Sequence, residues 1–256
     1  MKRVPLICVL LIISNFIISQ NEVNNKKIDS TKIKSRSVSA NTTSSGTVTD
    51  IDGNVYLTIT IGRQTWMKEN LRVTRYANGD SIGTLSPDTL NIVELKSPKY
   101  QWAYNGDEKN APTYGRLYTW WVVSDSRNVC PTGWRIPSDE EFCILENTIE
   151  PNTDNDCNLI EHRGKNQGGF LKEAGLLYWK SPNLGADNRS AFSVMPAGIR
   201  YATGLFHCLG SHAYFWTTTE YDAKNVMTRR IYYDSKDVSR SWYFKEDSLS
   251  IRCIKN

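Results

Sequence analysis

The residue types able to do chemistry in this chain are its six cysteines and three histidines. His207, Cys208 and His212 lie close enough in sequence to form part of a zinc site, since zinc is bound by imidazole and thiolate groups. The segment lacks a fourth ligand, and its strand-like pattern would spread the three side chains over both faces. We therefore interpret it as a surface loop, and we expect neither a metal nor a cofactor.

Motifs for nucleophilic catalysis and phosphate binding are missing from the sequence, which has no Gly-x-Ser-x-Gly elbow and no P-loop. The formal net charge of +4 is small, and no long run of Lys and Arg is present, so we expect no nucleic-acid partner. The neighbouring carboxylates of Asp139, Glu140 and Glu141 stand in the first turn of a predicted helix, where they stabilise its dipole. These residues therefore indicate no catalytic site.

The elements that must position the polar residues follow from the spacing of apolar side chains. Residues 55–61 alternate between apolar and polar types, which predicts a strand with one buried face. Short helices are predicted at 117–124, 139–149 and 169–174, the second beginning with a capping box. The runs MTRRIYYD, VSRSWYF and LSIRCIK, separated by short turns, predict a C-terminal antiparallel meander. Two or three short helices, a small antiparallel sheet and long loops make an α+β fold.

The N-terminal residues 1–19 have the pattern of a secretory signal peptide. Lys2 and Arg3 precede an apolar run that is too short to span a bilayer as a helix, and we expect cleavage after Ser19. A retained N-terminal anchor is the alternative. Residues 20–46 are rich in Asn, Lys, Ser and Thr without apolar periodicity, which predicts a flexible spacer. We therefore expect a secreted or cell-surface protein with no membrane span after signal cleavage.

Seven blocks of sequence occur in one order through the rest of the chain. They are VTDIDGNVYLTITIGRQTWMKENL, YGRLYTWW, CPTGWRIPSDEEF, FLKEAGLLYWKSPN, FSVMPAGIRYATGLF, YFWTTTEYD and SIRCIKN. This order resembles the Fibrobacter succinogenes major paralogous domain family, whose members are mostly secreted or surface proteins. The resemblance covers residues 47–256 and implies one domain. That domain is similar to the formylglycine-generating (sulfatase-modifying) enzymes, which implies a C-type-lectin-like fold.

The resemblance leaves a binding module and an enzyme as the two main function classes. The sulfatase-modifying enzymes use a closely spaced pair of cysteines, late in the domain, to hold copper, because a soft Cu(I) ion needs both thiolates together. Here Cys208 and Cys253 are the only cysteines in that half, and they lie far apart. We therefore expect a non-catalytic module that binds a glycan or a surface protein. An oxidase related to those enzymes is the alternative, and a structural or matrix role is a third.

A calcium site of the kind found in lectins is not expected. In calcium-dependent lectins a Glu-Pro-Asn triplet in a long loop binds calcium and sugar, whereas residues 150–152 directly follow a predicted helix. We interpret this triplet as a polar loop, although Asp154 and Asp156 nearby offer oxygen ligands of the kind calcium prefers.

Secretion and the resemblance together predict two disulfides. Cys130 and Cys253 each belong to a block of the resemblance, and a secreted chain meets an oxidising compartment, so we expect them to be bonded. Cys143, on a predicted helix, and Cys157, in the loop after it, are expected to form the second pair. Cys208 then remains unpaired.

The ligand-binding residues are predicted from aromatic side chains in the late strands and loops, because loops over a fixed lectin-like scaffold are where binding belongs by analogy. Exposed aromatic rings stack on sugars or anchor a protein partner. We expect Trp179, Tyr201 and Trp242 to supply contact area, with Asn183, Asp187 and Asn188 as polar partners. Burial of these rings in the core is the alternative.

Overall fold

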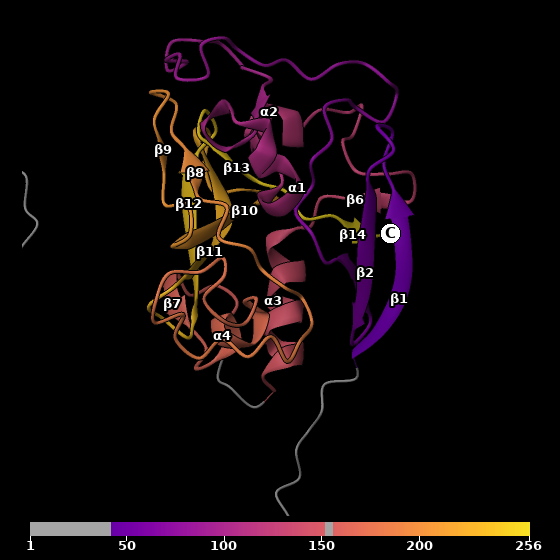
Figure 1. The fold of residues 1–256 in the computed structure, drawn as a ribbon, viewed down its shortest axis with the longest axis vertical. Helices are drawn as coiled ribbons and strands as arrows, with labels where there is room; N and C mark the ends of the chain where they lie inside the picture. Colours follow the sequence, from indigo (N-terminus) through magenta and orange to yellow (C-terminus); the bar gives the residue numbers. More distant parts are fainter. Residues whose placement is uncertain (1–41, 152–155) are drawn as a thin grey trace, which may run out of the picture. The chain divides into compact units, whose positions relative to one another are not determined.

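The computed structural model describes residues 42–151 and 156–256 (Figure 1). The expected signal peptide, nearly all of the expected spacer and Asp154 lie outside the described residues. Strands predominate in the described part, together with four short α-helices and two 3₁₀ turns. An α+β class is therefore correct at this coarse level.

One sheet of five strands has the order β1-β2-β3-β14-β6. Its strands are β1 (Thr42–Thr49), β2 (Val55–Ile61), β3 (Gln64–Met67), β6 (Trp134–Arg135) and β14 (Ile254–Lys255). All four neighbouring pairs are antiparallel. The C-terminal strand β14 therefore lies inside the sheet, between β3 and β6, rather than at its edge.

The strand predicted at 55–61 forms, but its first half buries the opposite face from the one its apolar residues suggest. Val55 and Leu57 are about half exposed, whereas Tyr56 and Thr58 are buried. Tyr56 is turned inward because its hydroxyl donates a 2.6 Å hydrogen bond to the Asp50 carboxylate across the preceding turn. A large ring with a buried partner for its hydroxyl thus outweighs two aliphatic side chains.

The first strand begins earlier than the domain boundary expected at residue 47. Strand β1 pairs with β2 from Thr42 onward, within the stretch expected to be a spacer. An edge strand is held by main-chain hydrogen bonds to one neighbour, so it needs no apolar periodicity of its own. Residues 42–46 of the expected spacer therefore pair as part of a strand.

A second, nine-stranded sheet has the order β4-β5-β13-β10-β11-β12-β7, with β8 paired to β13 and β9 paired to β8. The strands are β4 (Gln101–Trp102), β5 (Leu117–Thr119), β7 (Glu161–Arg163), β8 (Ile199–Arg200), β9 (Phe206–His207), β10 (His212–Glu220), β11 (Asn225–Tyr232), β12 (Val238–Phe244) and β13 (Ser248–Ser250). The pair β10 and β13 is parallel, which makes this sheet mixed.

The expected meander is only partly correct. Strands β10, β11 and β12 form consecutive antiparallel pairs. The last run, LSIRCIK, does not pair with β12: Ser250 lies beside Phe215 of β10, and Ile254 enters the five-stranded sheet. The segment changes sheets because its residues 251–253 are fully buried between them, with Cys253 bonded to Cys130.

The helices are α1 (Ala111–Tyr114), α2 (Trp120–Val123), α3 (Asp139–Ile149) and α4 (Gln167–Leu171). The capping box of α3 is present as predicted, with both reciprocal bonds between Ser138 and Glu141. The helix expected at 117–124 begins as strand β5, and the one expected at 169–174 lies two residues earlier and ends sooner. Gly168 in α4 is required by close packing, because a Cβ there would lie 2.0 Å from the Asp237 carbonyl oxygen.

Helix α3 lies between the two sheets (Figure 1). Its apolar side packs Phe142 and Leu145 with Ile59 of the five-stranded sheet and with Phe215 and Ile231 of the other. A second core cluster, around Trp216 and Tyr118, contains the Cys130–Cys253 disulfide. The fold is therefore a helix between two sheets, closed by the C-terminal segment that joins both.

Both predicted disulfides are present. Cys130 and Cys253 have an S–S distance of 2.05 Å, and Cys143 on α3 is bonded to Cys157. Cys208 is the free cysteine of the described part of the chain. Two disulfides favour an extracytoplasmic location, because such bonds persist in oxidising compartments. Over the described residues, no helix is long and apolar enough to span a membrane.

Candidate functional site

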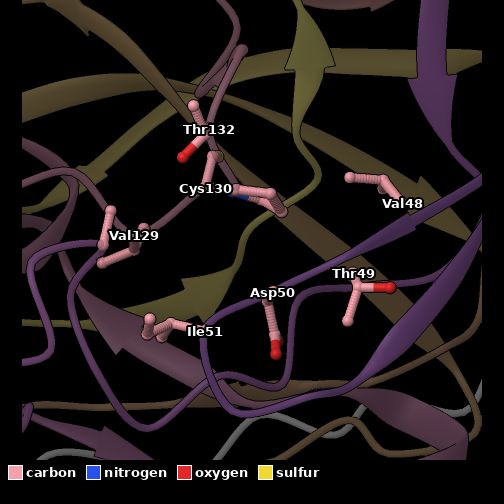
Figure 2. Close-up of a pocket in the computed structure, with 9 residues that line it drawn as sticks. Val48, Thr49, Asp50, Ile51, Val129, Cys130 and Thr132 are labelled. Atoms are coloured by element: carbon pink, nitrogen blue, oxygen red, sulfur yellow. The ribbon is translucent and has the colours of Figure 1, made fainter.

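In the described part of the chain we consider three of the hollows that could hold a ligand, and the first lies beside the Cys130–Cys253 disulfide. It has a volume of about 220 Å³ and is lined by the end of β1, the following turn and residues 129–132 (Figure 2). Its carboxylate, Asp50, already accepts four hydrogen bonds, from the amides of Asp52 and Asn54, the Asn54 side chain and the Tyr56 hydroxyl. Cys130 is therefore oxidised and the Asp50 carboxylate is already engaged within its own turn.

The second hollow, of about 360 Å³, is a mixed polar and apolar surface between β2 and the loop after α4. Lys68, Glu69 and Glu173 line it together with Leu57 and Tyr178. Glu173 is engaged by the side-chain amide of Asn188 at 2.9 Å. The charges here belong to both signs and the ring of Tyr178 packs edge-on against Tyr114, so no single ligand chemistry is selected.

The third hollow is an apolar cleft of about 340 Å³, which we call the Trp242 cleft. Its lining residues are Tyr201, Ala202, Thr203, Trp242, Tyr243, Phe244 and Asp247. One wall is the turn between β8 and β9, and the other is the end of β12 with the turn that follows. Two of the three aromatic residues predicted from the sequence, Tyr201 and Trp242, therefore lie in one cleft.

The turn that forms the first wall is held from several directions. The main-chain amide of Gly204 donates to the Tyr201 carbonyl, and the Ala202 carbonyl accepts the Ile92 amide at 2.8 Å. The Ala202 amide in turn donates to Asp247 Oδ1 at 3.0 Å, which ties this wall to the opposite one. Gly204 has φ +94°, and a Cβ there would lie 1.8 Å from the Thr89 carbonyl oxygen, so only glycine fits. The cleft is thus preformed in its backbone.

The second wall presents aromatic rings on both faces of β12. Trp242 is 38% exposed and stacks on Tyr221, with ring centroids 5.9 Å apart and nearly parallel planes. Phe244, half exposed, packs edge-on against Trp242. Tyr243 points to the other face and contacts Tyr214. Neighbouring exposed rings of this kind form an apolar patch, which makes this wall a candidate site of contact.

Titration behaviour in the cleft is shifted by burial. Burial raises the pKa of Tyr201 to about 12, with the nearby Tyr243, Cys208 and Asp247 adding to the effect. Burial also raises the pKa of the Asp247 carboxyl to about 6, although the Ala202 amide and Arg200 act in the opposite direction. A carboxyl of raised pKa in a concave site is a candidate functional position.

The expectation for Trp179 is wrong. Its ring is 2% exposed, packs in the core with α3, and donates its indole N–H to the Val194 carbonyl at 2.9 Å. Trp179 lies in an irregular loop, where neighbouring side chains do not alternate as they do in a strand, so the pattern could not indicate which one turns inward. The ring has no face to offer a ligand.

The three predicted polar partners do not line the Trp242 cleft. Asn183 is buried and donates to the carbonyls of Glu173 and Gly175, which closes their loop. Asn188 bonds to the side chains of Glu173 and Ser193, and exposed Asp187 pairs with Arg189. Asn183 and Asn188 are thus used within the loop, and no contact joins the three to Tyr201 or Trp242.

Asp247 is the residue of the cleft that sequence reasoning missed. It stands in the polar turn KEDS between β12 and β13, where an aspartate is ordinary. Its burial, at 5% exposure, arises only because the β8–β9 turn folds over it. The burial that distinguishes Asp247 therefore depends on tertiary contacts, which the local sequence does not reveal.

The histidines and Cys208 do not form a metal site. No group of three or more His, Cys, Asp or Glu side chains is arranged to hold an ion anywhere in 42–151 or 156–256. His207 packs against Tyr201, whereas His212 packs among tyrosines of β10 and β11. Burial lowers the pKa of His212, so this ring is held neutral.

A cluster of buried charges joins α3 to the second sheet, but it encloses none of the three hollows. Arg229 of β11 pairs with Asp139 and Glu146, Arg163 of β7 pairs with Glu146, and Arg240 of β12 pairs with Asp139. Burial raises the pKa of Asp139, but bonds and charges from Arg240 and Arg229 outweigh it and hold that pKa below its usual value. The arrangement is that of an interior ion network that fixes the helix on the sheet.

Comparison with known proteins gives one positive result. The model of the Fibrobacter succinogenes major domain matches residues 59–255, which include both walls of the Trp242 cleft. No curated protein matches the chain, and no solved structure does.

Proposed function

The chain belongs to the Fibrobacter succinogenes major domain family, and we propose that it is a secreted or cell-surface, non-catalytic module that binds a glycan or protein ligand in the Trp242 cleft. The scaffold of this proposal is a C-type-lectin-like fold. The capped turn of Ser138 and Glu141 and the C-terminal strand that enters the first sheet support that assignment.

The observation that carries the proposal is the cleft itself. It brings together Tyr201 and Trp242, which are far apart in sequence, on a backbone that main-chain bonds hold in place. Concave, mostly apolar sites with a few directed polar groups are the usual form of a binding pocket. Asp247 is the directed polar group here.

The alternative of an oxidase related to the formylglycine-generating enzymes is less well supported. Such an enzyme needs two late cysteines that act as a pair, and Cys253 is bonded to Cys130. Cys208 is free, and its sulfur lies 3.8 Å from the Tyr214 hydroxyl, with no second thiol beside it in the described residues. A non-catalytic role therefore fits the cysteines better.

The test is to capture a ligand with the protein on a glycan array and from bacterial surface proteins, and then to compare two variants. Trp242→Ala is expected to abolish capture while the melting curve stays close to that of the wild type. Leu177→Ala is the matched control, because Leu177 is an apolar side chain 80% exposed and outside the Trp242 cleft. If Trp242→Ala captures the ligand as well as Leu177→Ala does, the cleft is not the binding site.

A further inference from the structure

One face of strands β10, β11 and β12 carries an arginine among rings and hydroxyl groups. Arg230 of β11 lies directly beside Tyr214 of β10 and Ser239 of β12 in the register of the sheet. Because side chains alternate along a strand, the pairs two residues away share this face. We call it the Arg230 face, and its residues are His212, Tyr214, Arg230, Tyr232, Ser239 and Tyr243. Arg230 and most of the others are partly exposed, so solvent reaches the face.

The Arg230 guanidinium has few and distant partners for its five N–H donors. Nη1 donates to the Tyr243 hydroxyl at 3.4 Å and Nη2 donates to the Ser239 hydroxyl at 3.2 Å, both long for a charged donor. Nη2 also lies 3.9 Å from a carboxylate oxygen of Glu161, whose side chain is 66% exposed. Nε is buried and has no hydrogen-bond partner among the described residues. The charge of Arg230 is therefore only weakly compensated within the protein.

Arg230 differs from the other arginines with such a buried Nε. Arg163 and Arg252 also lack a partner for that atom within residues 42–151 and 156–256. Their side chains are closed off from solvent, and each still makes a bond of ordinary length, to the Cys157 carbonyl at 3.0 Å and to the Asn70 side chain at 2.7 Å. The Arg230 side chain remains 19% exposed. A ligand can therefore reach it, and an anion would supply the missing bonds.

The Arg230 face adjoins the Trp242 cleft through Tyr243. This residue lines the cleft, and the Arg230 guanidinium lies 5.7 Å from its ring centre. Asp247 also lines the cleft, and its carboxylate repels an acid group there, whereas Arg230 attracts one. A ligand that extends from the cleft past Tyr243 therefore meets a negative site first and a positive site next.

The groups around Arg230 suit a sugar better than an acidic side chain. Tyr232, Tyr243 and Ser239 supply hydroxyls that both donate and accept hydrogen bonds. The rings of Tyr232 and Tyr243 lie 5.6 and 5.7 Å from the guanidinium and add apolar surface. A pyranose ring has several hydroxyls and an apolar C–H face, so it can use all of these groups. The carboxylate of an aspartate or glutamate side chain would use the guanidinium alone.

We propose that the Arg230 face binds a uronic acid unit of an acidic glycan, with the carboxylate of the sugar paired to Arg230. This inference rests on the function proposed above, since it takes a glycan as the ligand that continues from the Trp242 cleft. Glu161 is the internal anion that competes with the ligand for the guanidinium.

The experiment follows the Nε–H signal of Arg230, identified by its loss in Arg230→Lys, in ¹H–¹⁵N spectra of the protein. The probes are methyl β-glucuronide, the neutral methyl β-glucoside and Nα-acetyl-aspartate methylamide. We expect the glucuronide to shift this signal and to bind about tenfold more tightly than either of the other probes, because only the glucuronide combines the charge with the hydroxyls.

Glu161→Gln tests the same assignment without a change at the arginine. It removes the competing carboxylate from an exposed position, so the affinity for the glucuronide should rise about threefold while that for the glucoside stays the same. The matched control is Glu140→Gln, because Glu140 is exposed on α3, which packs on the opposite face of the second sheet. This control makes the same chemical change and should leave both affinities unchanged.

The wild-type protein alone can overturn the inference. Equal affinities for the glucuronide and the glucoside, or an Arg230 signal that no probe shifts, would contradict it. Binding of the aspartate probe as tightly as the glucuronide also contradicts it, and indicates an acidic peptide instead. In each of these cases the proposed function still stands if Trp242→Ala abolishes capture of a ligand, and it falls if that variant does not.

Discussion

Replacing Glu146 by Gln is expected to be among the most destabilising conservative changes in this protein. The Glu146 side chain is 1% exposed and holds two arginines: Oε1 accepts Arg229 Nε at 2.7 Å, and Oε2 pairs with Arg163 Nη2. Gln keeps the shape of the side chain but removes its charge. Asp139 still neutralises Arg229, whereas Arg163 keeps only the carbonyls of Asp156 and Cys157.

The magnitude follows from leaving one buried guanidinium without a counter-charge. Removing one partner of a buried pair costs about 3–5 kcal/mol, because the remaining charge stays desolvated. The matched control is Asp187→Asn, which breaks the pair with Arg189, because both side chains of that pair are exposed, at 39% and 61%. An exposed pair contributes only about 0–1 kcal/mol. The two variants make the same chemical change and differ in burial.

The assay is urea denaturation with the disulfides intact, which gives the free energy of unfolding and its dependence on denaturant. We expect the Glu146→Gln midpoint to fall sharply and that of Asp187→Asn to stay near the wild type, with the slope unchanged in both. Equal effects of the two variants, or a loss below about 1 kcal/mol for Glu146→Gln, would refute the reasoning that burial of Arg163 sets the cost.

Three further outcomes are expected. Replacing Cys130 and Cys253 by Ala should lower the free energy of unfolding by about 5 kcal/mol, because their bond closes a sequence separation of 123 residues. Denaturation measures this loss, and adding a reducing agent should destabilise the variant less than it destabilises the wild type. Trp179→Ala should cost about 3–5 kcal/mol, whereas Trp242→Ala should cost roughly 1 kcal/mol or less, and melting curves that rank them the other way contradict the burial assignment. Asp247→Asn should raise the free energy of unfolding by about 3 kcal/mol well above pH 6 and by nothing below about pH 4, because only the ionised carboxylate is destabilised by burial in the folded state; a difference independent of pH contradicts this.

Local features of the fold could be predicted because they are encoded in neighbouring residues. The cap of α3 requires only Ser138 and Glu141, three residues apart, and both of its bonds form. The Cys130–Cys253 bond could be predicted because each cysteine lies in a block of the resemblance. In both cases the information is carried by residue identity and does not depend on how distant segments meet.

The arrangement of the last segment could not be predicted in the same way. The pattern of LSIRCIK fits a strand, but a pattern does not select the neighbour of that strand. Ile251, Arg252 and Cys253 are all buried, and Arg252 donates to the Asn70 side chain and the Phe192 carbonyl. Partners so distant in sequence draw the segment away from β12 and into the other sheet.

The two walls of the Trp242 cleft differ in how far the sequence could predict them. Tyr201 belongs to FSVMPAGIRYATGLF, one of the blocks that carry the family resemblance, whereas Trp242 and Asp247 stand outside all of these blocks. The first wall is also the more constrained one, since Gly204 fits only as glycine and Ala202 bonds in two directions. The second wall is an edge of β12 and a turn, where side chains change with little cost to the fold. A constrained wall that faces an adaptable one would let a single scaffold take different ligands. If the cleft binds a ligand as we propose, we expect the side chains at Trp242, Phe244 and Asp247 to set its specificity.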